Sequence, residues 1–256
     1  MQRKHFIKKS LLGGGGLLTA GFARAAVKGE NDPPESGKPF KLNYGIHDGM
    51  FKNNAGKDFI DQIKFAYDIG FRSIEDNGMA GRPVEQQKAI GDALAKLGMS
   101  MGVFVLDKGG NDANTIASGK PENLEIFLKG CRQAVEISKR CNGKLTTMVP
   151  GDFERELPIG IQTGNVIDAL RRGVEILEPH GIVMVLEPLS DSPNRFLRNS
   201  DQTYAICKGV NSTSCKILFD MLHMQGNEGK INHKMDLPNG EIAYFQRGNN
   251  PGRNEP

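Results

Sequence analysis

The sequence lacks the features that define several large classes of protein. A transmembrane helix needs about 20 predominantly apolar residues, and the apolar run at residues 11–22 is shorter and includes the glycines Gly13 to Gly16. There is also no P-loop, no dinucleotide-binding fingerprint and no Gly-x-Ser-x-Gly elbow in the globular part. We therefore expect no stable membrane anchor and none of the nucleotide-binding or serine-hydrolase chemistries that these motifs mark.

Cysteine is scarce, and its spacing does not indicate a metal finger. The four cysteines are Cys131, Cys141, Cys207 and Cys215, and no two of them form a C-x-x-C pair. Buried thiols are the simplest interpretation. A disulfide is the alternative in an oxidising compartment, but the sequence alone does not pair the cysteines.

Acidic residues are absent before Glu30, whereas basic residues lie on both sides of the apolar run. This arrangement is typical of an export signal, and Ala23-Arg24-Ala25 matches the small-x-small site that signal peptidase cuts. We expect a signal peptide over residues 1–25, a flexible proline-rich spacer over 26–39 and one globular domain over 40–256.

Residues 3–8 read Arg-Lys-His-Phe-Ile-Lys and resemble a twin-arginine export motif with lysine in the second position. That route carries folded proteins, which suits a protein that loads a metal in the cytoplasm, so we expect a periplasmic location. An ordinary secretory signal and a basic tail are the alternatives. Removing residues 1–25 takes five of the 33 basic residues and none of the 30 acidic ones, which leaves a net charge of −2. We therefore expect no nucleic-acid partner.

Short apolar runs alternate with longer segments in which apolar residues recur at helical spacing, a pattern typical of βα units and a parallel sheet. The expected strands are residues 42–47, 71–75, 99–106, 144–149, 182–186, 215–219 and 241–245, and the expected helices are 59–69, 84–97, 121–140, 166–177 and 200–208. The pattern predicts an α/β fold of the (β/α)8 TIM-barrel type, incomplete, with about seven strands and without the eighth βα unit.

Polar residues follow most of these strands. They are His47, Asp48, Glu75, Asp76, Asp107, Glu187, Asp220, His223 and Gln246. Because the carboxyl ends of the strands converge in a TIM barrel, we expect these side chains to share one site. Carboxylate, imidazole and amide oxygen together suit a divalent metal such as Mn²⁺, Mg²⁺, Co²⁺ or Zn²⁺.

Such an ion would bridge the carbonyl and hydroxyl oxygens of an α-hydroxycarbonyl compound and stabilise the enediolate formed when a carbon-bound proton leaves. A neighbouring carboxylate would move that proton. A single acid at a strand end can instead be a helix N-cap or a solvated charge. Glu187 fits that alternative least well, because glutamate is not a favoured N-cap and this one directly follows the apolar run 182–186.

Several stretches resemble signature segments of hydroxypyruvate isomerases and related sugar isomerases and epimerases, which have the xylose-isomerase-like TIM barrel. They are residues 182–189 (IVMVLEPL), 218–225 (LFDMLHMQ) and 244–256 (YFQRGNNPGRNEP), with 75–79 and 101–105 extending the likeness toward the N-terminus. Three separate motifs in this order are more specific than any one of them.

The resemblance implies a role for each matching residue. Glu187 is a metal ligand and the catalytic acid/base, and Asp220 and Gln246 are the other metal ligands. His223 and Arg253 hold the substrate's oxygens, and His47 and Glu75 are further substrate-binding candidates. His223 as a core histidine and Arg253 as a surface charge beside a turn are the alternatives.

The family takes a fourth ligand, a glutamate that is also the second acid/base, from an eighth strand that this sequence does not provide. We therefore expect a shortened form of a longer protein, with a degenerate non-catalytic relative as the alternative.

The expected activity is a metal-dependent isomerase, of the aldose–ketose or the hydroxypyruvate/tartronate-semialdehyde type, or an epimerase, acting on a small sugar or hydroxy-keto acid through an enediolate. A non-catalytic periplasmic sugar-binding barrel or an inactive fragment is the alternative. A related apurinic-site endonuclease is disfavoured by the five histidines and the negative net charge. A homo-oligomer is possible, and the sequence does not specify the sugar or the metal.

Overall fold

The computed structural model describes residues 37–236 and 239–253. The predicted signal peptide (1–25) and all of the predicted spacer (26–39) except its last three residues lie outside the described residues. Within the described residues, no helix combines the length and the apolar character needed to cross a bilayer.

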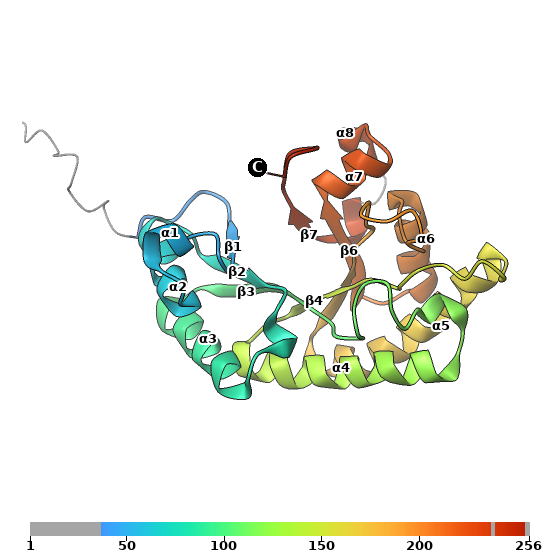
Figure 1. Cartoon of the computed structure of the whole chain (residues 1–256), viewed down its shortest axis with the longest axis horizontal. Coiled ribbons are helices and arrows are strands. Elements are labelled where there is room, and N and C mark those ends of the chain that lie inside the picture. The colour runs from blue at the N-terminus through green and yellow to red at the C-terminus, as the bar shows by residue number, and fades with distance from the viewer. Residues whose placement is uncertain (1–36, 237–238, 254–256) are drawn as a thin grey trace, which may run out of the picture. The chain divides into compact units, whose positions relative to one another are not determined.

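Seven parallel strands form one sheet in which each strand pairs with the next along the chain. They are β1 (Gly45–His47), β2 (Ser73–Asp76), β3 (Ser100–Val105), β4 (Leu145–Met148), β5 (Val183–Leu186), β6 (Cys215–Asp220) and β7 (Ile242–Gln246). The sheet curls, and β1 and β7 are its two edges (Figure 1). The predicted fold, an incomplete (β/α)8 barrel with about seven strands, is confirmed.

Each strand from β2 to β5 is followed by a long helix, and these helices pack side by side on the outer face of the sheet (Figure 1). The helices are α1 (Lys52–Ala55), α2 (Phe59–Asp68), α3 (Val84–Leu97), α4 (Pro121–Cys141), α5 (Ile159–Leu177), α6 (Ser200–Val210), α7 (Met221–Asn227) and α8 (Ile231–Asp236). Helix α3 has the predicted bounds, and it ends at Gly98, whose φ of 64° is the left-handed conformation that glycine adopts without strain.

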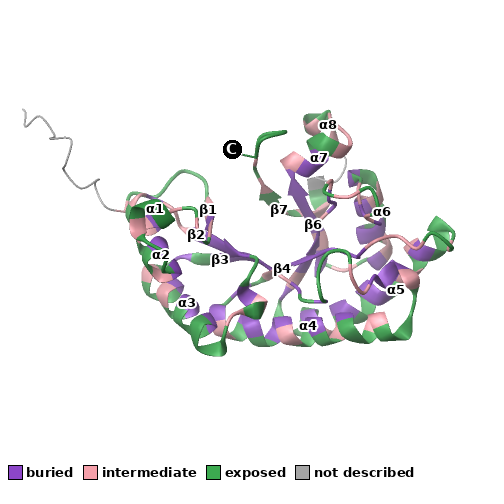
Figure 2. Ribbon diagram, in the orientation of Figure 1, coloured by how far each residue is buried: buried purple, intermediate pink, exposed green. Residues whose placement is uncertain are grey.

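Two layers of apolar side chains surround the strands. The larger one lies between the sheet and the helices and includes Phe104, Phe127 and Leu170. The smaller one joins Val103 of β3 to Val185 of β5 and Leu218 of β6; because β3 and β5 are separated by β4, this contact places the layer inside the curl of the sheet. Figure 2 shows the consequence, with the strands largely buried and α4 carrying both buried and exposed stretches.

Helix α5 begins seven residues before the predicted start. Its first turns expose Ile159 and Ile161, so the apolar period that predicts a helix becomes visible only from Val166. The early turns are stabilised by a polar side chain instead. Gln162 is 1% exposed, accepts a hydrogen bond from the backbone N–H of Glu154 and donates to the carbonyls of Glu154 and Leu157.

All four cysteines are buried and unpaired by disulfides, as the simplest interpretation of their spacing predicted. Burial raises the pKa of the Cys131 thiol to about 12. A thiol of that pKa is not a nucleophile at neutral pH.

Gly91 permits the close crossing of α3 and α4. A Cβ atom there would lie 2.1 Å from the carbonyl oxygen of Arg140 and 2.9 Å from the Cα of Cys141. We expect Gly91→Ala to lower the free energy of unfolding by about 1–3 kcal/mol, because the two helices must move apart. Gly164→Ala in α5 is the matched control, since a Cβ there meets no atom within 4 Å. It should stabilise the protein slightly, and urea unfolding of both variants measures the difference.

Candidate active site

The predicted site residues lie at one rim of the curled sheet because the strands are parallel and their carboxyl ends point the same way. Asp220 and Gln246 end β6 and β7 and are register partners. His47 and Glu75 are register partners at the ends of β1 and β2. Glu187 directly follows β5.

Glu187, Asp220 and His223 form the tightest group at this rim. Each offers one metal-ligating atom, and these atoms lie within 4.8 Å of one another. Arg253 joins the group from the C-terminal segment, with its Nη2 atom 2.7 Å from Asp220 Oδ2 and its Nη1 atom 3.3 Å from His223 Nε2. The chain thus brings together four of the predicted site residues, namely Glu187, Asp220, His223 and Arg253.

The short helix α7, which the sequence pattern did not predict, places His223 beside Asp220. Asp220 is its N-cap, and one carboxylate oxygen, Oδ1, accepts a hydrogen bond from the backbone N–H of Leu222 at 2.8 Å. The second oxygen, Oδ2, is left to face the site. His223 follows one helical turn later, so its ring lies over the same carboxylate, 3.7 Å from Oδ2.

Both ring nitrogens of His223 face hydrogen-bond donors of neighbouring residues. The backbone N–H of Ser190 points at Nδ1 at 3.2 Å, and the Ser190 hydroxyl lies 2.9 Å from the same atom. The backbone N–H of Ser190 can only donate, and so can Arg253 Nη1, which lies 3.3 Å from Nε2, so these contacts favour opposite tautomers of the neutral ring. Burial holds the pKa of His223 below its usual value, which favours that neutral form.

Glu187 is held in an environment that opposes its charge. Burial is the main cause and the nearby carboxylate of Asp220 is the second, and together they raise the pKa of Glu187 to about 8. No hydrogen-bond donor to its carboxylate is present in the described part of the chain. A carboxyl group that titrates near neutrality can both accept and release a proton during turnover.

Glu75 is the centre of a second group at the same rim. Its carboxylate accepts hydrogen bonds from Tyr244 Oη at 2.7 Å, from Gln246 Nε2 at 2.9 Å and from His47 Nε2 at 2.8 Å. Burial would raise its pKa, but the hydrogen bonds from His47, Tyr244 and Gln246 outweigh it and the pKa of Glu75 is lowered. The hydrogen bond to Glu75 raises the pKa of His47 in turn.

Gln246 provides the observation that tests whether the site fits a metal. Its Nε2 atom is committed to Glu75, which orients the amide, and its Oε1 atom is buried with no hydrogen-bond partner among the described residues. A buried amide oxygen without a partner is costly unless something else pairs with it. Together with the carboxylates of Glu187 and Asp220, this oxygen makes a donor set that suits a divalent cation. The residues present therefore fit the predicted ion.

Tyr244 is a site residue that the sequence reasoning did not single out. It lies two positions before Gln246 on β7, so both side chains point to the same face of the strand, and that period-two spacing is the signal that would have identified it. Its hydroxyl passes close to Gly102, where an added Cβ would lie 2.4 Å from Oη. Gly102 thus leaves the space that Tyr244 needs to reach Glu75.

Two other acids at strand ends have a structural role. The guanidinium of Arg82 binds Asp76 Oδ2 through Nε at 2.6 Å and Asp48 Oδ2 through Nη2 at 2.8 Å. These ion pairs connect the loops after β1 and β2. Because both carboxylates are paired with Arg82, neither Asp48 nor Asp76 is available to bind a metal ion. Sequence position alone did not separate Asp48 and Asp76 from the acids that face the site.

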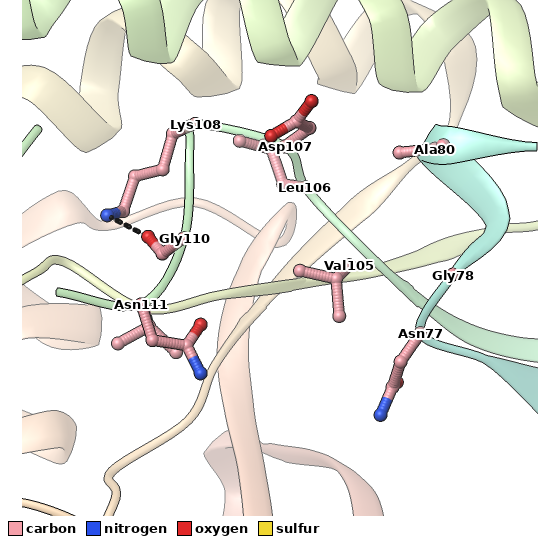
Figure 3. A pocket seen from close by; sticks show the side chains of 11 residues that line it. Asn77, Gly78, Ala80, Val105, Leu106, Asp107, Lys108, Gly110 and Asn111 are labelled. Atoms are coloured by element: carbon pink, nitrogen blue, oxygen red, sulfur yellow. Dashed lines mark hydrogen bonds between the residues drawn. The ribbon is translucent and has the colours of Figure 1, made fainter. Parts of the chain in front are cut away.

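A cavity of about 320 Å³ lies beside the rim, between the loops that follow β2 and β3 (Figure 3). It is bounded by Asn77, Asp107, Lys108, Asn111 and Val149, among others. Lys108 is buried, and its ammonium group donates to the carbonyl of Gly110 at 2.8 Å. Burial lowers the pKa of Lys108 to about 8. The surface that lines this cavity is more apolar than polar.

Comparison with known proteins agrees with this geometry. Residues 63–256 match the model of the xylose isomerase-like TIM barrel family, and the chain belongs to that family. It is 24% identical over 206 residues to hydroxypyruvate isomerase of Escherichia coli K12, covering 78% of this chain and 77% of the relative. It is 26% identical over 204 residues to 2-oxo-tetronate isomerase of Pectobacterium atrosepticum, covering 77% and 76% of the two chains.

Solved structures with the same fold have lower identity. A family 2 AP endonuclease from Brucella melitensis superposes with a TM-score of 0.69 at 19% identity, covering 81% of this chain and 79% of that one. The IOLI protein, whose structure contains a bound zinc atom, superposes with a TM-score of 0.65 at 16% identity, covering 80% and 72%. These likenesses establish the shared barrel and no more.

The raised pKa of Glu187 makes a prediction about stability in the metal-free protein. The folded state binds the proton of Glu187 more tightly than the unfolded state does, so its contribution is stabilising at acidic pH and is lost as pH rises from about 4.5 toward 8. We expect Glu187→Gln to raise the free energy of unfolding by about 2 kcal/mol at pH 8.5 and by little at pH 5, with partial exposure reducing the full linkage value.

Urea unfolding at the two pH values in the presence of a chelator measures this difference. Glu175→Gln is the matched control, because Glu175 is exposed on α5. An equal effect of Glu187→Gln at both pH values would contradict the environment described for Glu187.

Proposed function

We propose that the protein is a metal-dependent isomerase or epimerase that moves a proton at a carbon next to a carbonyl group in a small sugar or hydroxy-keto acid. The observation that carries the proposal is the grouping of Glu187, Asp220 and the unpartnered Oε1 of Gln246 at the open rim of the barrel. The two similar proteins named as isomerases support the reaction class, since both are named for hydroxy-keto acid substrates.

Glu187, Asp220 and Gln246 would hold the ion. Their oxygen donors favour Mn²⁺, Mg²⁺, Co²⁺ or Zn²⁺, and the set does not choose among them. When bound, the ion would supply Lewis-acid polarisation of the substrate's carbonyl and the adjacent hydroxyl, which makes the neighbouring C–H proton more acidic.

Side chains of the protein carry out the proton transfer and bind the substrate. Glu187 takes the proton from carbon and returns it, because its carboxylate lies at the rim beside Asp220 and accepts no hydrogen bond from the described residues. His223 lies beside Asp220, where its ring can form a hydrogen bond with a substrate oxygen. Arg253 lies beside both residues with 47% of its side chain exposed, so its guanidinium can pair with a substrate carboxylate.

Arg253 favours hydroxy-keto acids over neutral sugars as the substrate class. A guanidinium binds a carboxylate through two parallel hydrogen bonds, and a neutral sugar has no group that uses this geometry fully. The proposed export to the periplasm is compatible with either class. A sugar-binding barrel without catalysis remains the rival function, and turnover separates the two.

The reaction is tested by proton exchange. We expect the protein with Mn²⁺ to exchange the C–H proton next to the carbonyl of hydroxypyruvate, or of another compound in a panel of ketoses and hydroxy-keto acids, in D₂O. Glu187→Gln should reduce exchange by about 10²–10⁴-fold, the usual contribution of an acid/base group. Asp220→Asn should also weaken Mn²⁺ binding measured by calorimetry, whereas the exposed Asp168→Asn should not. If no compound in the panel shows exchange, the isomerase proposal is refuted and the non-catalytic sugar-binding protein becomes the favoured function.

The role of Arg253 is tested by comparing substrates. Arg253→Gln should raise the KM for a carboxylate-bearing substrate by about 10–100-fold, which corresponds to the loss of a charge-assisted hydrogen bond. The KM for a neutral ketose should change little. The exposed Arg172→Gln in α5 is the control, and Mn²⁺ affinity is measured in parallel because Arg253 also contacts Asp220. Equal changes for both substrates would assign Arg253 to the metal site instead.

A further inference from the structure

His47 and Glu75 form a pair that the proposed function does not yet use. His47 Nε2 lies 2.8 Å from Glu75 Oε2, and Glu75 is almost fully buried while 39% of the His47 side chain is exposed. The pair therefore combines a buried carboxylate with an imidazole that reaches solvent at the mouth of the barrel. That is the arrangement by which a carboxylate orients a histidine for proton transfer.

The ring nitrogens of His47 have different environments. An ionised carboxylate can only accept, so Nε2 carries the proton that is shared with Glu75. The other nitrogen, Nδ1, has no partner in the described part of the chain and retains its lone pair. A neutral His47 thus presents a proton acceptor at Nδ1, and a protonated His47 presents a proton donor at the same atom.

The order of the strands places His47 across from Glu187. In a (β/α)8 barrel, strands four positions apart face one another, and His47 and Glu187 end β1 and immediately follow β5. The metal-binding candidates Asp220 and Gln246 are on β6 and β7. His47 is also close to them, because Glu75 Oε2 accepts from both His47 and Gln246. A substrate held at Asp220 and Gln246 is therefore flanked by Glu187 on one side and His47 on the other.

We propose that His47, oriented by Glu75, is a second catalytic acid/base that acts on the opposite side of the substrate from Glu187. This role rests on the proposed function and goes beyond the substrate-binding role expected from the sequence. Glu75 is a positioning residue, since its carboxylate touches His47, Tyr244 and Gln246 rather than the reacting atoms.

The proton balance of the step is simple. Ionised Glu187 removes the proton from the hydroxyl-bearing carbon, and the electron pair of that C–H bond becomes part of the enediolate double bond. Protonated His47 then gives its Nδ1 proton to the neighbouring carbon, or to the opposite face of the same carbon in an epimerisation. One carbon-bound proton leaves the substrate and one enters it; in an isomerisation the hydroxyl oxygen also loses its proton to water as its carbon becomes the carbonyl, and the former carbonyl oxygen takes a proton from water. Glu187 ends protonated and His47 neutral, and exchange with water restores both.

The charges that face His47 are consistent with both protonation states. Glu75 and Asp76 on β2 favour the imidazolium, whereas burial and the guanidinium of Arg253 oppose it. The hydrogen bond to Glu75 is the largest influence, so the pKa of His47 is raised above its usual value near 6.5. The raised pKa favours the protonated form that presents a proton donor at Nδ1.

The direct test is the variant His47→Gln, with His180→Gln as the matched control because His180 is exposed next to α5, away from the rim. We expect His47→Gln to lower conversion of substrate to product by about 10²–10⁴-fold. Exchange of the substrate's own C–H proton with D₂O should persist, because Glu187 still removes and returns it. Conversion that stays within threefold of the unaltered protein would overturn the proposal, as would a parallel loss of exchange and conversion.

Two measurements on proteins with an intact fold complete the test. In the unaltered protein acting in H₂O on substrate deuterated at the reacting carbon, a separate donor predicts that no label reaches the product. Transfer of the label to the product would show that one group does both steps. In the metal-free protein, ¹⁵N NMR should find the neutral His47 ring protonated on Nε2, and protonation on Nδ1 would contradict the mechanism.

The failure of this inference is distinct from failure of the proposed function. Absence of exchange in the unaltered protein refutes the isomerase itself and the role of His47 with it. Exchange and conversion that His47→Gln leaves unchanged refute only the role of His47. Calorimetry of Mn²⁺ binding should give the same affinity for His47→Gln and for the control, and a loss of affinity in His47→Gln alone would assign the residue to the ion instead.

Discussion

The buried carboxylate of Glu75 is the interaction on which the rest of the site depends. It takes hydrogen bonds from His47 on β1 and from Tyr244 and Gln246 on β7, so it connects the two edge strands of the sheet through β2. A buried charge is tolerated only where donors surround it. The need to satisfy Glu75 therefore orients the Gln246 amide, keeps the Tyr244 hydroxyl next to Gly102 and holds the ring of His47 at the rim.

A second group of charged side chains lies at the same rim of the sheet. Glu187 and Asp220 bring two carboxylates into a partly buried space, and Arg253 is the cation that contacts Asp220 there. Burial is the main reason that the pKa of Glu187 is raised, and repulsion from the carboxylate of Asp220 adds to it. Two neighbouring carboxylates attract a divalent cation because their negative charges repel each other without one. This repulsion acts on Glu187, the group proposed to move the proton.

The agreement between sequence and structure differs from element to element for physical reasons. The bounds of α3 were predictable because its apolar residues Ile90 and Leu94 repeat at helical spacing and Gly98 ends it. The start of α5 was not, because Gln162 stabilises it through loop carbonyls rather than through apolar burial. Helix α7 was missed for a similar reason, since its N-cap Asp220 had been assigned to the metal alone and its seven residues are too few to show a period.

The sequence by itself determined the fold class and indicated most of the polar residues at the rim, because alternating apolar runs specify βα units and polar residues at strand ends converge when the strands are parallel. Only the tertiary structure decided which of those residues pair with one another and which face the site. It placed His223 between Ser190 and Arg253, left Gln246 Oε1 without a partner among the described residues, and paired His47 with Glu75 while Arg82 took Asp48 and Asp76. These choices depend on contacts between strands and loops far apart in the chain, which residue order does not encode locally.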